Sequence, residues 1–124
     1  MMKSHQPPSL WLAPGIYEST FTSYRFVDSF CKINKVTLEE LSSDARHTEV
    51  RQPRQMLMRL LKLNFYKLSL KEVGNMFNRN HATVLHAIKT VQNLYDTDRD
   101  FRAFYNSMIN QIERDNYLQQ PLIR

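Results

Sequence analysis

Apolar residues recur at helical spacing along most of the chain, and this pattern predicts a domain built from helices alone. The first helix is expected over about residues 21–33. Its apolar stripe would consist of Tyr24, Val27, Phe30 and Cys31. Thr37 and Glu40 then match a capping box, in which the side chain and the backbone of the two residues satisfy each other's N–H groups. A short second helix over about 38–43 should follow, with Leu38 and Leu41 buried.

The stretch "SSDARHTEVRQ", residues 42–52, is polar and has no clear period, so it is expected to be a loop. Pro53 suits the first turn of the next helix, where its missing N–H costs nothing. The apolar stripe of that helix would be Met56, Leu57, Leu60 and Leu61, continued by Asn64. Residues 65–68 should form a short connection.

The next two elements have the layout of a helix-turn-helix. Ser69 and Glu72 form a second capping box, which opens a two-turn helix over 69–77 with Leu70, Val73, Met76 and Phe77 on its buried side. "NRN", residues 78–80, is expected to be a turn, and Asn80 is a good N-cap for a helix over about 81–95. In this motif the first residues of the second helix meet base edges in the major groove of DNA.

A last helix over about 98–115 is indicated by Thr97 and Asp100. Its apolar residues are Phe101, Phe104, Tyr105, Met108 and Ile112. The 124 residues fit one small all-α domain of about six helices, similar to the Trp repressor class. We expect residues 1–20 to be an N-terminal arm, residues 21–115 the domain, and residues 116–124 a C-terminal tail.

Positive charge is concentrated in the middle of the chain. Residues 51–95 carry eight basic side chains and one acidic one, a net charge of +7 in a protein whose total is +5. A focused basic segment is typical of a protein that binds a polyanion such as nucleic acid. The alternative is a charged face that only keeps the protein in solution.

His81 and His86 stand five residues apart, and this spacing does not favour a metal site. Residues of a helix advance roughly 100° each, so the two histidines face different directions. A helical metal pair requires a spacing of three or four, and no cysteine or carboxylate lies nearby to complete a site. His86 falls on a polar, basic face with Lys89. The opposite side of the helix is predicted to be an apolar seam of Val84, Ile88, Val91 and Tyr95. The alternatives are a capping role for His81 and an ordinary exposed position for His86.

Composition excludes several further classes of function. Only two glycines occur, Gly15 and Gly74, so no Gly-rich phosphate loop is possible. No pairing of a nucleophile with a base suggests catalysis, and no cofactor is expected. Cys31 is the only cysteine, which favours a reducing cytoplasm, either of a bacterium or of a cell that carries a phage or mobile element. The apolar patch near the start is interrupted by Pro14 and Gly15 and is too short for a membrane span.

The segments "PRQMLMRLLK" and "SLKEVGNMFNRNHATVLHAIKTV" closely resemble the C-terminal DNA-binding domain of the bacterial replication initiator DnaA. The resemblance covers about residues 24–114, and it implies binding to a short, asymmetric, AT-rich duplex site, the DnaA box. It also implies a role for each matching residue. Arg46 would enter the minor groove. Phosphate contacts would come from Arg54, Gln55 and Lys62. Base reading near the recognition helix, flanked by Arg79 and Lys89, would fall to Asn80, His81, Ala82, Thr83 and His86.

The chain departs from the family pattern at the turn and in the basic loop. A Gly-Gly pair is reduced to Asn78, an aspartate is replaced by Asn80, and a threonine by Ala82. Asp44 and Glu49 dilute the positive charge of the loop. Recognition of the box is therefore expected to be altered or weaker than in the family.

The function implied is sequence-specific binding of double-stranded DNA, in replication initiation or its regulation, without ATPase activity. Such a protein could mark an origin on a mobile element, compete with a host replication initiator for boxes, or regulate transcription. The alternative is an interaction module that binds replication proteins and has lost base specificity. Binding to random duplex DNA as a function of salt would separate the two classes.

Overall fold

The computed structural model describes residues 20–65, 67–116 and 122–124. Within these residues the chain forms six helices and no strand, so the predicted all-α fold is confirmed. The helices are α1 (Thr20–Asn34), α2 (Leu38–Leu41), α3 (Thr48–Asn64), α4 (Leu70–Met76), α5 (His81–Thr97) and α6 (Arg99–Asn116). None of these helices is both long and apolar enough to cross a membrane. The predicted N-terminal arm lies outside the described residues, apart from Thr20.

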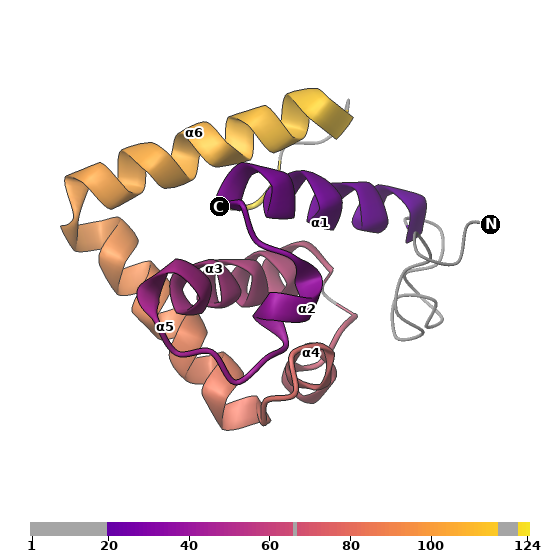
Figure 1. Cartoon of the computed structure of the whole chain (residues 1–124). Helices are drawn as coiled ribbons and strands as arrows, with labels where there is room; N and C mark the ends of the chain where they lie inside the picture. The colour runs from indigo at the N-terminus through magenta and orange to yellow at the C-terminus, as the bar shows by residue number, and fades with distance from the viewer. Residues whose placement is uncertain (1–19, 66, 117–121) are drawn as a thin grey trace.

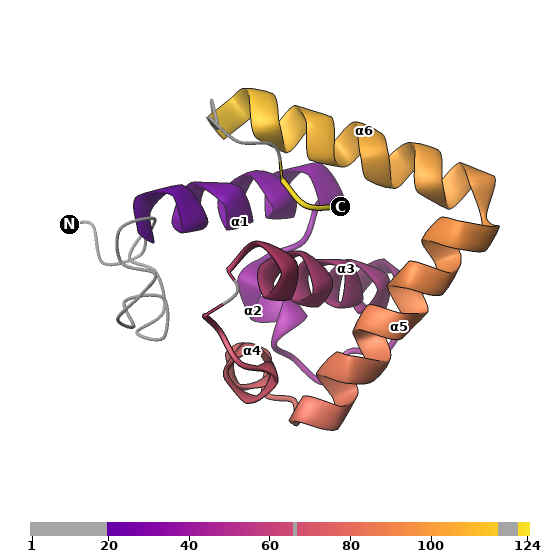
Figure 2. The same ribbon diagram turned by 180° about the vertical axis from the view of Figure 1, so that it is seen from behind.

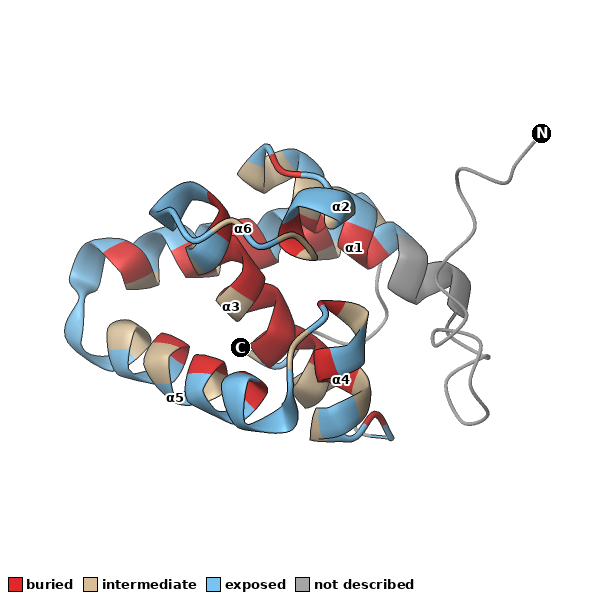
Figure 3. Cartoon of the chain, turned by 60° about the horizontal axis from the view of Figure 1, so that its bottom comes forward, coloured by how far each residue is buried: buried red, intermediate tan, exposed pale blue. Residues whose placement is uncertain are grey.

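Helix α3 occupies the centre of the domain (Figures 1 and 2). Helices α1 and α6 pack against each other on one side of it, while α4 and the first turns of α5 lie at the opposite end. Every residue from Met56 to Leu61 is buried, so α3 is enclosed over most of its circumference (Figure 3). A helix enclosed in this way fixes the positions of all the helices that pack on it.

The predicted seam of α5 is confirmed. Val84 and Val91 are fully buried, and Ile88 and Tyr95 are partly buried against the core. Complete burial of a side chain of this size stabilises a fold by about 1.5–3 kcal/mol. Because the seam faces α3, the opposite side of α5 is left to solvent.

Both predicted capping boxes are present. The Thr37 hydroxyl accepts from the backbone N–H of Glu40 at 3.0 Å, and the Glu40 carboxylate accepts from the N–H of Thr37 at 2.8 Å. Ser69 and Glu72 form the same pair of bonds at the start of α4. These local bonds explain why the beginnings of α2 and α4 could be predicted from the sequence.

The prediction of a loop over residues 42–52 was wrong at its C-terminal end. Helix α3 begins at Thr48, and Pro53 is its sixth residue rather than a member of its first turn. The added turn buries Val50, which is only 5% exposed, and the segment contains no glycine to oppose it. Burial of this side chain offsets the one helical hydrogen bond that the proline cannot donate. The loop between α2 and α3 is therefore short, residues 42–47.

The beginning and the apolar stripe of α6 also differ from the prediction. Thr97 is the last residue of α5, and Asp98 caps α6 by accepting the N–H of Phe101 at 3.0 Å. Phe104, expected in the core, is 46% exposed. The buried face is completed instead by Ile109, which the sequence analysis did not include. Phe26 on α1 was likewise missed, and the side chain of Tyr24 lies outside the described residues.

A buried arginine joins the helices around α3. Arg59 is 8% exposed, and its guanidinium donates to the Tyr105 hydroxyl at 3.3 Å and to the side-chain oxygen of Gln92. It also donates to the carbonyl of Arg124, which lies in the region predicted as a tail. Residues 122–124 return to the domain here, and Ile123 donates its N–H to Asn64 at 2.8 Å. These bonds supply partners for a charge that would be costly to bury alone.

Gly74 allows the close approach of α4 to the turn that follows it. A Cβ atom at this position would lie 2.4 Å from the backbone oxygen of Arg79, well inside contact distance. We expect Gly74→Ala to lower the free energy of unfolding by about 1–3 kcal/mol, measured by urea denaturation, because backbone must move to accommodate the methyl group. The control is Asn75→Ala, at an exposed position of the same helix, where the change should stay within about 0.5 kcal/mol. Equal effects at the two positions would contradict the steric argument.

Candidate nucleic-acid interface

The predicted helix-turn-helix is formed by α4, the turn at 77–80 and α5. Asn78 adopts a left-handed conformation with φ of 57°, which asparagine tolerates better than most residues. The chain then reverses, and the N–H of Arg79 donates to the carbonyl of Gly74 at 2.9 Å. A single left-handed asparagine is therefore enough to make this turn.

Asn80 is the N-cap of α5, as predicted. Its side-chain oxygen accepts from the backbone N–H of Thr83 at 2.9 Å and from the Thr83 hydroxyl at 3.1 Å. The first turn of α5 contains no acidic side chain. The positive end of the helix dipole is therefore not neutralised from within the helix, which favours an anion such as phosphate.

The face of α5 opposite its buried seam is exposed over three turns. The predicted site residues on this face are Ala82, His86 and Lys89. His81 and Thr83 are also exposed, but they leave the first turn of the helix in other directions. His86 places a ring nitrogen 3.4 Å from the Thr90 hydroxyl, one turn further along the same helix. No group of three or more His, Cys, Asp or Glu side chains within the described part of the chain could hold a metal ion.

The loop at 42–47 lies beside the turn and the start of α5. The side chain of Arg46 is exposed and makes no hydrogen bond or ion pair with any described residue. A groove of about 450 Å³ separates this loop and α3 from α5. Among the side chains that line it are Arg46, Arg51, Arg54, Gln55, Arg79 and Thr83. The structure thus brings together residues that are far apart in the sequence, and four of them are arginines.

Two of these arginines use their guanidinium groups inside the protein. Arg54 is 5% exposed, and it donates to the carbonyls of Leu41, Ser43 and Ala45. Arg79 is partly buried and donates to the carbonyls of Phe77 and Ser43. Burial, and after it the positive charge of Arg79, lowers the pKa of Arg54. The basic excess of residues 51–95 is consequently not all at the surface, since Arg54 and Arg59 are internal.

Lys62 is placed differently from the exposed lysines. It lies in the last turn of α3, is partly buried, and donates to the carbonyl of Leu68 at 3.1 Å. This bond fixes the connection that precedes α4. An ammonium group has three N–H donors, so the contact leaves two for another acceptor.

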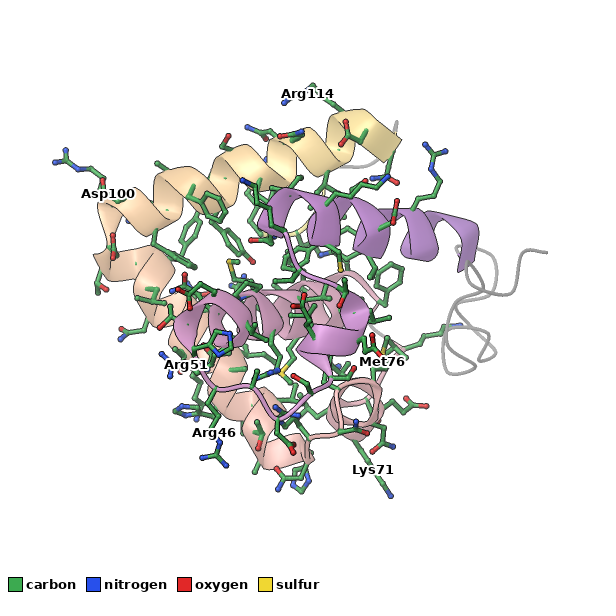
Figure 4. All side chains as sticks on the ribbon, viewed as in Figure 1. Arg46, Arg51, Lys71, Met76, Asp100 and Arg114 are labelled. Carbon is green, nitrogen blue, oxygen red and sulfur yellow. The ribbon has the colours of Figure 1, made fainter. Side chains whose placement is uncertain are left out.

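Arg51 belongs to the same surface and was not among the predicted site residues. It is exposed, donates to the Arg46 carbonyl at 3.3 Å, and extends from the same side of the domain as Arg46 (Figure 4). Residues 48–52 are predicted from the sequence to be a loop. A loop has no regular period, so the side on which Arg51 lies cannot be predicted from its position. The signal that could have revealed it is the position of Val50, seven residues before Leu57, which continues the apolar stripe of α3 at helical spacing.

A compact set of helices in which the exposed second helix of the motif lies beside an arginine-bearing loop defines a helix-turn-helix DNA-binding domain. The family model described as the bacterial DnaA protein helix-turn-helix matches residues 27–91, and the chain belongs to this family. The DnaA C-terminal domain binds double-stranded DNA in replication initiation and is not itself catalytic.

Two relatives show how much of a longer protein the similarity covers. The chain is 43% identical over 75 residues to the chromosomal replication initiator protein DnaA of Flavobacterium psychrophilum, which is 60% of this chain and 16% of that protein. It is 34% identical over 79 residues to the protein of the same name from Chromobacterium violaceum, which is 63% of this chain and 17% of that protein. The chain therefore matches about one sixth of the length of these relatives.

Arg51 is expected to contact a DNA phosphate beside Arg46. Arg51→Ala should weaken binding to all duplexes by a similar factor and reduce the slope of log affinity against log salt by about one. Fluorescence anisotropy over a range of salt concentrations measures both quantities. The control is Arg114→Ala, which removes the same charge from α6 at the opposite edge of the domain (Figure 4). If both variants change the slope equally, general electrostatics and not a local contact is responsible.

Proposed function

We propose that the protein binds a short, asymmetric, AT-rich duplex resembling a DnaA box, and that it acts in replication initiation or its regulation. The observation that supports this most directly is the placement of exposed Arg46 and the exposed start of α5 on two sides of one groove. The two elements can then contact adjacent grooves of one duplex, with α5 in the major groove. Competition with a host replication initiator for the same boxes is a consequence of such binding.

We assign the exposed residues to two groups: those that contact base edges and those that contact the phosphate backbone of the DNA. His81, Ala82, Thr83 and His86 are exposed in the first turns of α5 and are proposed to meet base edges. The methyl group of Ala82 suits a thymine methyl, whereas the polar side chains suit hydrogen-bonding edges. Gln55, Lys62 and Lys89 are proposed to contact phosphates, which position the protein without reading sequence.

We propose that the chain itself has no ATPase activity. Its only glycines are Gly15 and Gly74, and Gly74 is occupied in the helix-turn-helix. A phosphate loop of the P-loop type needs glycines at fixed spacing, and the sequence does not provide them.

The central experiment compares one box duplex with a duplex of the same composition in scrambled order. We expect the wild-type protein to prefer the box by at least about tenfold at physiological salt, and both affinities to fall steeply as salt increases. Equal affinity for the two duplexes would reject sequence-specific recognition and favour an interaction module that has lost base specificity.

Arg46 is expected to read the minor groove. A narrow AT-rich minor groove concentrates negative potential and attracts arginine, and the Arg46 side chain has no competing partner among the described residues. Arg46→Ala should therefore relax the preference for A·T pairs at one end of the site, as measured by selection from a random duplex pool. Arg114→Ala again serves as the charge-matched control and should select the wild-type site. An unchanged site in the Arg46 variant would exclude this role.

Substitution of Asn80 tests whether a capping residue can also contact a base edge and select the base. The family has an aspartate here, which can only accept and therefore suits the cytosine amino group, while an asparagine amide suits adenine. Its oxygen already caps α5, so only the amide nitrogen remains for a base. Selection with wild type and with Asn80→Asp should return adenine and cytosine, respectively, at one position. Aspartate keeps the cap, so stability should not differ and provides the control. The same base in both pools would show that Asn80 is a cap only.

A further inference from the structure

We propose that Arg54 and Arg79 are positioning residues, whose guanidinium groups hold the loop at 42–47 against the helix-turn-helix and so set the place of Arg46 relative to α5. This inference rests on the proposed function, because it assigns Arg46 and α5 to two parts of one DNA site. It differs from the phosphate contact that the family resemblance implies for Arg54.

Arg54 fixes the loop from the side of α3. Its Nε donates to the Leu41 carbonyl at 2.6 Å, and Nη2 donates to the Ala45 carbonyl at 2.9 Å and to the Ser43 carbonyl at 3.3 Å. Leu41 is the last residue of α2, where carbonyl groups have no partner within the helix. One planar guanidinium therefore satisfies a carbonyl at the end of a helix and two carbonyls of the loop that follows it.

Arg79 fixes the same loop from the side of the turn. Its Nη2 donates to the Ser43 carbonyl at 2.7 Å, and its Nη1 donates to the Phe77 carbonyl at 2.7 Å. The carbonyl oxygen of Ser43 thus accepts from both arginines, one bond to each of its two lone pairs. Through this single oxygen, α3 and the helix-turn-helix hold one point of the loop.

Two further hydrogen bonds join the loop to the helix-turn-helix at Ser42, one residue before Ser43. The Ser42 hydroxyl donates to the Met76 carbonyl at 3.1 Å, and the Asn78 amide donates to the Ser42 carbonyl at 3.2 Å. Asn78 is the left-handed residue of the turn, so the turn and the loop are joined where each of them reverses direction.

The bonds from Arg54 and Arg79 stop at Ala45, and Arg46 is the first residue beyond them. Its side chain is exposed, while its backbone follows directly from a segment held at several points. A loop that is already ordered loses little conformational entropy when it binds, and preorganisation of this kind strengthens binding without adding a contact. It also fixes the separation between the minor-groove and major-groove contacts, which sets the spacing that the protein accepts within its site.

Arg54→Lys is the variant that separates positioning from phosphate contact. Lysine keeps the charge and can still bind a phosphate, but its single ammonium cannot reproduce the planar fork that spans three carbonyls. Circular dichroism and urea denaturation establish that the variant is folded. Should it fail to fold, Arg79→Lys replaces it, since Arg79 is only partly buried and its loss removes one of the two bonds to the Ser43 carbonyl.

The first measurement needs no DNA. Amide hydrogen exchange, or backbone NMR relaxation, of residues 43–47 should show a more mobile loop in Arg54→Lys than in wild type, with α6 as an internal reference. Gln55→Ala is the matched control, because Gln55 lines the same groove without holding the loop. Unchanged mobility of the loop in the lysine variant would overturn the proposal.

The second measurement is a double-mutant cycle with Arg46→Ala on the box duplex and the scrambled duplex. If Arg54 positions Arg46, Arg54→Lys should weaken box binding by about tenfold, the scale of one lost base contact, and reduce the salt slope although no charge is removed. The double variant should then be no weaker than Arg46→Ala alone. If Arg54 only contacts a phosphate, Arg54→Lys should bind both duplexes almost as wild type does. That result, or losses that simply add to those of Arg46→Ala, would reject the positioning role.

The exchange measurement and the double-mutant cycle distinguish failure of the proposed function from failure of the positioning role. If wild type shows no preference for the box, the proposed function fails, and the exchange data still decide whether Arg54 orders the loop. If wild type prefers the box but the cycle is additive, the proposed function stands and the positioning role is rejected.

Discussion

The surface proposed to bind DNA depends on the burial of the Arg54 guanidinium among backbone carbonyls. Removing a charged group from water costs several kcal/mol unless its N–H groups find acceptors. Here the acceptors are carbonyls at the end of α2 and in the loop that follows, groups that would themselves be costly to leave without donors. The guanidinium supplies donors for the carbonyls, and the carbonyls supply acceptors for the guanidinium. These bonds hold the loop against α3.

Helix α3 can support this arrangement because it is enclosed by the other helices. Its apolar residues fix α1, α2, α4 and α5 around it, while its first turns carry Arg51, Arg54 and Gln55 to the groove. At its other end, buried Arg59 donates to side chains of α5 and α6. Arg54 and Arg59 are thus both buried and hydrogen-bonded, but at different places. Arg54 holds the loop beside the groove, whereas Arg59 connects α5 and α6 behind it.

The arginines beside the groove divide into exposed and internal groups. The side chains of Arg46, His81 and Lys89 have no bond to any described residue, whereas Arg54 and Arg79 donate only to backbone carbonyls. The proposed binding surface therefore combines unbonded exposed side chains with a backbone held by hydrogen bonds. That combination allows close contact with phosphates and base edges at a small entropic cost.

The sequence by itself determined the local features of this protein. The capping boxes at Thr37 and Ser69, the cap at Asn80 and the seam of α5 depend on residues within one or two turns of one another, so their spacing was enough to predict them. The two segments at residues 53–62 and 69–91 were enough to indicate the family.

Only the tertiary structure decided the start of α3 and the role of its arginines. Thr48–Gln52 is helical because Val50 reaches a core assembled from other helices. The spacing of Val50 from Leu57 fits a helix, but by itself it does not decide between a helix and a loop. The contacts of Arg54 and Arg79 with Ser43 join residues 11 and 36 positions apart. A long, charged side chain is expected in solvent when it is judged from sequence, and its carbonyl partners become visible only when the fold brings them together.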